Sequence, residues 1–144
     1  MLLIEQLLFD YSDVEPLGFP RELSTDIIAV SDYIDKHYMA NIKLDQLSQI
    51  TGLSKYHLVR CFTREMGISP YSYLETIRIN NAKKLLEKGT TPSEVAFQCG
   101  FSDQSHFTKF FKKMIGLTPK QYMRVFANEP GSRRLIHHGR IIAI

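Results

Sequence analysis

Apolar residues in the middle of the chain recur every three to four positions, the spacing of a helix with one buried face. Within residues 25–39 the apolar positions are Ile27, Ile28, Val30 or Ser31, Ile34 and Tyr38. Similar patterns, divided by polar or glycine-containing segments, predict about seven helices at residues 25–39, 44–50, 55–65, 70–88, 92–98, 104–114 and 119–127. No hairpin signal lies between them. We therefore predict an all-α domain over residues 24–127.

Residue types at the expected helix ends support these boundaries. Ser24 and Ser54 are suited to cap a helix, because a hydroxyl oxygen accepts a hydrogen bond from an unpaired backbone N–H. Ser69-Pro70 and Thr118-Pro119 add a proline in the first turn, where its missing N–H costs nothing. On the longest helix, over 70–88, the buried face is expected to comprise Tyr71, Leu74, Ile77, Ala82, Leu85 and Leu86.

One short pattern occurs twice in the chain, 49 residues apart. Segment 54–73 aligns with segment 103–122, with identical pairs at His57 and His106, Phe62 and Phe111, Gly67 and Gly116, Pro70 and Pro119, and Tyr73 and Tyr122. Upstream the offset falls to 48, which pairs Gly52 with Gly100 and leaves one extra residue at Ser102-Asp103. A helical unit duplicated around a glycine-containing turn predicts two helix-turn-helix modules, and so a protein that contacts two neighbouring segments of DNA.

Positive charge is concentrated on the repeated unit. The whole chain of 144 residues has a formal net charge of +3, yet residues 46–127 carry twelve Lys or Arg against five acids, and residues 1–24 carry five acids against one Arg. This is the distribution that contact with phosphates requires. A hydrophobic content of 44% with no long apolar stretch favours a soluble, cytoplasmic protein without membrane contact. Cys61 and Cys99, which form no CxxC motif, are expected to be reduced packing residues.

The second helix of each module is the one expected to enter a major groove of DNA. Its outward residues, the candidates for reading bases, are Tyr56, Val59 and Arg60 in the first module and Gln104, Ser105, His106 and Lys109 in the second. Arg60 can bind guanine through two hydrogen bonds, and Gln104 can bind adenine in the same way. Candidate phosphate contacts are Lys43, Lys55, Lys112, Lys113 and Lys120.

An outward Lys or Arg on a helix is more often a solvated charge than a ligand contact. Arg60 and Lys109, however, occupy equivalent positions of the two copies, which favours a shared role at DNA. His57 is interpreted as a capping or packing residue at its turn, whereas His106 is placed near DNA.

The second copy resembles the signature of AraC/XylS-type transcription regulators. The resemblance rests on Ser93-Glu94-Val95-Ala96, Cys99 through Phe107, Phe110 through Lys113, Gly116, Thr118-Pro119 and Tyr122, with weaker matches in the first copy, and it covers about residues 26–126. It implies two helix-turn-helix subdomains, joined by the helix after Pro70, that bind two successive major grooves. It also implies the same reading positions as the face analysis, although Val59 stands where many members have a polar residue.

The remaining segments extend the domain at both ends. Residues 1–23 are interpreted as a helix over 2–9 and a linker, and resemble the end of a sensor or dimerisation domain that is otherwise missing. We expect a fragment of a longer regulator, bound to DNA as a monomer and dimerising through that missing domain, while a naturally short regulator stays open. Residues 128–144 are interpreted as a loosely packed tail. His137-His138 lacks the further ligands of a metal site.

Three functions compete at this stage. The leading hypothesis is a sequence-specific transcription regulator, an activator that recruits RNA polymerase, as the family resemblance implies. The alternative is a non-specific or architectural nucleic-acid-binding module. An enzyme is disfavoured, because the sequence shows no Cys-His nucleophile, paired carboxylates, metal cluster or phosphate-binding loop, and it implies no cofactor.

Overall fold

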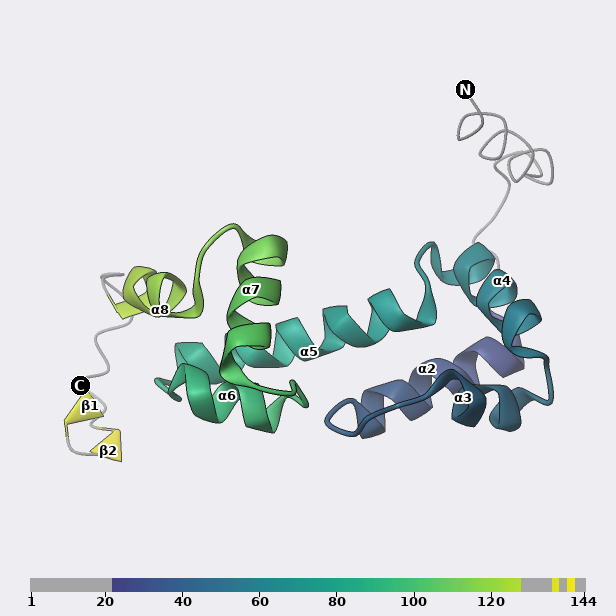
Figure 1. Ribbon diagram of the computed structural model, residues 1–144, viewed down its shortest axis with the longest axis horizontal. Helices are drawn as coiled ribbons and strands as arrows, with labels where there is room; N and C mark the ends of the chain where they lie inside the picture. The colour runs from purple at the N-terminus through teal and green to yellow at the C-terminus, as the bar shows by residue number, and fades with distance from the viewer. Residues whose placement is uncertain (1–21, 128–135, 138–139, 142–144) are drawn as a thin grey trace, which may run out of the picture.

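The computed structural model describes residues 22–127, 136–137 and 140–141 (Figure 1). Residues 22–127 form an all-α domain, as the sequence predicts. Its helices are α2 (Thr25–His37), α3 (Leu44–Thr51), α4 (Lys55–Met66), α5 (Pro70–Glu87), α6 (Pro92–Gln98), α7 (Gln104–Ile115) and α8 (Pro119–Ala127). The predicted boundaries are therefore correct to within about two residues, since the caps and glycines that end each helix are local signals.

Two separate hydrophobic cores divide the domain into two modules. The first core is formed by residues of α2, α3, α4 and the beginning of α5, and its fully buried members are Ile27, Val30, Ile34, Leu58 and Phe62. The second is formed by the end of α5 with α6, α7 and α8, and includes Val95, Phe107 and Phe111. In Figure 1 the two modules lie at opposite ends of α5, which links them as one continuous helix of 18 residues.

The duplication extends to side-chain contacts inside each module. The ring of Tyr73 packs edge-on against Phe62 at a centroid distance of 5.7 Å, and Tyr122 packs in the same way against Phe111 at 5.4 Å. Each tyrosine hydroxyl donates a hydrogen bond to a carboxylate of the preceding long helix. Tyr73 donates to Asp35 over 3.0 Å, and Tyr122 donates to Glu87 over 2.6 Å.

The expected buried face of α5 is partly wrong. Leu74, Ala82 and Leu86 are buried, but Tyr71 is 61% exposed, and Ile79 and Arg78 are buried instead. The reason is that α5 contributes Leu74 to the first core and Ile79, Ala82 and Leu86 to the second. Pro70, Leu74, Arg78, Ala82 and Leu86 follow one another at intervals of four, so one buried stripe passes along α5 from the first module to the second, and Tyr71 lies outside the part that the first module covers.

Two further expectations for α2 also need correction. Ile28, counted as an apolar core position, is 44% exposed. Ser24 precedes α2 but its hydroxyl makes no cap to this helix; it donates instead to Glu65 at the end of α4, over 3.2 Å. Ser24 therefore links the start of α2 to the end of α4, whereas the sequence predicts only a contact within α2.

Beyond residue 127 the structure describes one antiparallel pair of short strands, β1 (Ile136–His137) and β2 (Arg140–Ile141). Ile136 pairs with Ile141, and His137 pairs with Arg140. The interpretation of the tail as loosely packed did not include this pair, because two residues per strand are too few to show an alternating pattern. The expected helix over 2–9, the linker and the rest of the tail lie outside the described residues.

None of the helices in the described part of the chain is long and apolar enough to cross a membrane. Both cysteines are free thiols, as expected. Cys99 is fully buried in the second core, and Cys61 is half-buried on α4.

The two thiols should therefore react at different rates. Burial raises the pKa of Cys99 to about 11, which leaves very little reactive thiolate at pH 8. We expect iodoacetamide at pH 8 to alkylate Cys61 in the folded protein and to reach Cys99 only in denaturant, as measured by mass spectrometry of the labelled peptides. Equal labelling of both cysteines in the native state would contradict the buried position of Cys99.

Candidate nucleic-acid interface

Helices α4 and α7 occupy equivalent positions in the two modules. Each begins with a capping side chain: Ser54 Oγ accepts from the backbone N–H of His57 over 3.2 Å, and Asp103 Oδ1 accepts from that of His106 over 2.7 Å. Each ends at a glycine with positive φ, Gly67 or Gly116, at 79° and 85°. Both helices run upward in Figure 1, at opposite ends of α5.

Asp103 is the residue that replaces Ser54 as the cap in the second copy. The hydrogen bond from the His106 backbone N–H lowers the pKa of the Asp103 carboxyl, with smaller contributions from Ser102 and Ser105. The ionised carboxylate at the start of α7 also interacts favourably with the helix dipole. This cap fixes the first turn of α7, the turn that carries Gln104, Ser105 and His106.

On α4, two of the three predicted reading residues are exposed. Tyr56 is 72% exposed, and Arg60 is exposed one turn further along. The Arg60 guanidinium carbon lies 5.7 Å from the centre of the Tyr56 ring, and its Nη1 is 3.5 Å from the Tyr56 hydroxyl oxygen. The Tyr56 ring therefore makes a weak contact with the guanidinium on the surface of the helix, of the kind worth about 0.5–1 kcal/mol at exposed sites.

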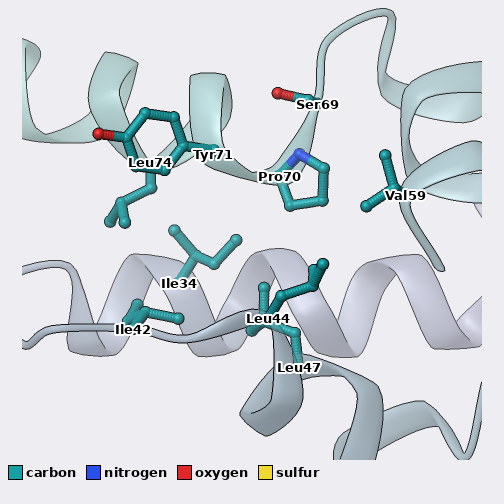
Figure 2. A pocket seen from close by; sticks show the side chains of 9 residues that line it. All are labelled: Ile34, Ile42, Leu44, Leu47, Val59, Ser69, Pro70, Tyr71 and Leu74. Carbon is teal, nitrogen blue, oxygen red and sulfur yellow. The ribbon is translucent and has the colours of Figure 1, made fainter. Parts of the chain in front are cut away.

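The third residue, Val59, is half-buried and borders an apolar pocket of about 290 Å³. Figure 2 shows Val59 at the α4 side of this pocket, with Pro70 and Tyr71 of α5 and Ile34 of α2 around it. The other lining residues are Ile42, Leu44, Leu47, Ser69 and Leu74. Only part of the valine surface therefore faces outward. Any contact of Val59 with a base would be a van der Waals contact.

On α7 all four predicted reading residues are exposed: Gln104, Ser105, His106 and Lys109. The His106 ring is also held by its own turn. Its Nδ1 is 3.2 Å from Ser102 Oγ, and the ring packs edge-on against Phe101 at 5.6 Å. The turn contacts expected of His57 thus occur at His106, because the second copy supplies an extra Ser102 and an aromatic Phe101. The His57 side chain is exposed.

The five lysines predicted to contact phosphates are all exposed. Lys112 and Lys113 lie in the last turn of α7, and Lys120 lies in the first turn of α8. Lys43 precedes α3, where its backbone N–H donates to Gln46 Oε1 over 2.8 Å. Lys55 differs from the others because it forms an ion pair of 2.8 Å with Asp45 of α3. A DNA phosphate would have to compete with that carboxylate.

Among the described residues, no group of three or more His, Cys, Asp or Glu side chains is placed to hold a metal ion. The candidate surface consists of two helices, their caps and a set of exposed cations. Paired helix-turn-helix units with exposed second helices define a DNA-binding domain.

The comparisons with known proteins agree with this class. Residues 47–125 match the family described as "Helix-turn-helix domain". The chain is 56% identical over 104 residues to an uncharacterised HTH-type transcriptional regulator, YbfI, of Bacillus subtilis, covering 72% of this chain and 38% of that protein. The chain spans less than half the length of the curated relatives it matches first.

Two solved structures show the same fold. A probable AraC family transcriptional regulator from Rhodopseudomonas palustris is 29% identical, with a TM-score of 0.64, over 72% of this chain and 98% of that one. The DNA-binding domain of AdpA, a global transcriptional factor, was solved in complex with a target DNA. It is 24% identical to this chain, with a TM-score of 0.70, and the match covers 75% of this chain and 98% of the AdpA domain. The chain belongs to the AraC-type helix-turn-helix family.

Proposed function

We propose that this chain is the DNA-binding part of a sequence-specific transcription regulator, and that α4 and α7 enter two successive major grooves. One observation carries the proposal: two equivalent helices, each with an exposed polar face, lie at opposite ends of one continuous helix and run in the same direction in Figure 1. The AdpA domain, which has the same fold, was solved with its target DNA, and this supports the assignment.

The dimensions of α5 suit this mode of binding. Its 18 residues give a length of about 27 Å at 1.5 Å per residue. Adjacent major grooves on one face of DNA lie about 34 Å apart. The two values are of the same order, and bending the DNA toward the protein would supply the difference at an elastic cost of about 1–6 kcal/mol.

The two reading surfaces differ in chemistry. On α4 the discriminating hydrogen bonds come from Arg60, which suits guanine, while Tyr56 and Val59 make van der Waals contacts with thymine methyl groups. On α7 the amide of Gln104 suits adenine, and Ser105, His106 and Lys109 add donors along the same turn. Lysines 43, 55, 112, 113 and 120 fix the register on the phosphates without reading sequence.

In the cell, this domain would act in the cytoplasm, where it binds a promoter and recruits RNA polymerase as an activator. It would bind DNA as a monomer through both modules. Footprinting and in vitro transcription from a bound promoter test the activator role, and the expected result is a rise in transcript when this protein is added.

Arg60→Ala should weaken binding to the preferred site by about 1–3 kcal/mol and relax the preference at one base step, because a two-hydrogen-bond contact is lost. The preferred site is first selected from random DNA sequences. Competition binding then compares this site with variants that are changed at the one base step. A true regulator should prefer its site over random DNA by roughly 10³-fold or more.

Lys112→Ala is the matched control, because it also removes one exposed cation. It should weaken binding to every sequence alike. It should also reduce the slope of the logarithm of affinity against the logarithm of salt concentration by about one. If Arg60→Ala left base discrimination intact, the assigned reading face of α4 would be wrong. If the wild-type domain bound random DNA as well as any selected site, the non-specific module would be the better description.

A further inference from the structure

The two modules meet at a junction formed by Arg78 of α5. Its Nε donates to the carbonyl oxygen of Tyr38 over 2.8 Å, and its Nη2 donates to that of Ala40 over 2.9 Å. Its guanidinium carbon lies 5.9 Å from the centre of the Phe101 ring. One side chain of the linking helix therefore contacts the segment after α2 in the first module and the turn of the second.

The guanidinium is held in a way that depends on its shape. Arg78 is only 9% exposed, and no carboxylate in the described part of the chain forms an ion pair with it. Its charge is instead met by two backbone carbonyls just after α2, next to the negative end of that helix's dipole, and Glu75 of α5 adds an electrostatic attraction. Two donors in a fixed planar fork reach both carbonyls at once, whereas a lysine ammonium donates from a single nitrogen at the end of a flexible stem.

The backbone of the two modules is in direct contact beside Arg78. A Cβ atom added to Gly100 would lie 2.6 Å from the carbonyl oxygen of Met39, which is closer than a van der Waals contact. Gly52, the equivalent turn glycine of the first module, has no atom within 4 Å of such a Cβ. The close approach is therefore specific to the junction and is no general requirement of the turn.

Arg78 lies on α5 where the first core ends and the second begins. Leu74 belongs to the first core, whereas Ile79 begins the residues of the second core. Arg78 lies between these two sets, at the point where the modules could rotate relative to one another about α5. Away from the helix axis, Arg78 joins the modules through the carbonyls of Tyr38 and Ala40 and through the Phe101 ring, and Gly100 packs next to Met39.

We propose that Arg78 is a positioning residue that fixes the orientation of α4 relative to α7, and so sets the spacing between the two half-sites that the domain accepts on DNA. This proposal rests on the proposed function. Loss of the junction leaves each reading surface intact but lets the two surfaces adopt several relative orientations. Binding at the preferred spacing then has to fix one relative orientation of the two surfaces, and this ordering lowers the affinity.

The test compares Arg78→Met and Arg78→Lys with the wild-type 144-residue chain. The DNA set carries the selected half-sites at the preferred spacing, at spacings changed by one and two base pairs, and as single half-sites. Arg78→Met should lower affinity at the preferred spacing by about tenfold, roughly the contribution of a hydrogen bond to a charged group. Affinity at the other spacings and for single half-sites should change much less, so the spacing preference flattens. Arg78→Lys should behave similarly.

Lys84→Met, an exposed position on the same helix, is the matched control and should keep the wild-type spacing profile. If both Arg78 variants lost affinity by one common factor on every DNA, or kept the wild-type profile, Arg78 would be a structural residue only and the proposal would fail. A wild-type domain that selects no two-part site would instead overturn the proposed function, and this proposal with it.

A second measurement needs no DNA. Residual dipolar couplings of the backbone amides of α4 and α7 should fit one common alignment tensor in the wild-type domain. Arg78→Lys is the milder change. In this variant the amide chemical shifts within each module should stay close to those of the wild type, while the couplings of α4 and those of α7 should require two different alignment tensors. One common tensor in the variant would show that α5 alone fixes the orientation, and would overturn the proposal.

Discussion

Phe111→Ala should lower the free energy of unfolding of the second module by about 3–5 kcal/mol, the usual cost of emptying a buried aromatic site. Phe111 is fully buried, and its ring packs against Phe107 at 5.5 Å and Tyr122 at 5.4 Å. Removing the ring leaves a cavity in the core that holds α7 against α8. Urea denaturation followed by circular dichroism gives the size of the loss.

Phe97→Ala is the matched control, since it is the same substitution in the same module. Phe97 on α6 is 85% exposed, so its removal should change stability by less than about 0.5 kcal/mol. Hydrogen exchange in Phe111→Ala should rise first in α7 and α8, while Leu58 and Phe62 keep α4 protected in the separate first core. Equal losses in the two variants would mean that the packing of the second core is not as described.

Gly100→Ala should destabilise the domain more than Gly116→Ala does. Both glycines have left-handed backbone angles, with φ of 81° and 85°, so an alanine costs about 1–2 kcal/mol at either position. At Gly100 the added methyl group would also lie 2.6 Å from the Met39 carbonyl oxygen, whereas at Gly116 nothing lies within 4 Å. Overpacking of this kind adds about 1–3 kcal/mol.

The difference between the two glycine variants, measured by urea denaturation, isolates the contact between the modules. The backbone strain is common to both variants, so it cancels in the comparison. Similar losses for Gly100→Ala and Gly116→Ala would show that Met39 moves away at little cost, and that the modules are less tightly joined than the distances indicate.

Much of this architecture follows from local signals. Glycines and capping side chains such as Ser54 and Asp103 set the ends of α4 and α7, because they satisfy backbone groups within a few residues. The two-module organisation follows from the repeat of Phe62 at Phe111, since an equivalent residue in an equivalent helix has to be buried in the same way. The exposure of Arg60 and Lys109 follows from their positions opposite these core residues.

Other features depend on contacts between distant segments and could not be inferred from periodicity. Tyr71 reads as a core residue but is exposed, because only part of α5 is covered by the first module. Val59 reads as a free surface residue but borders the apolar pocket formed with α2 and α5 (Figure 2). The partners of His106 come from the extra residue in its turn, whose effect on the ring depends on the path of the backbone.

The all-α class, the helix boundaries, the duplication and the family can be inferred from the order of residue types along the chain, because each rests on a repeated pattern of those types. How the two modules are joined can be seen only in the folded molecule. A buried Arg78 reads in the sequence as an ordinary charge on a helix, and its partners, the carbonyls of Tyr38 and Ala40, are backbone atoms about 40 residues away. Backbone acceptors leave no signature in residue types, so only their placement in space shows that this charge joins the two modules.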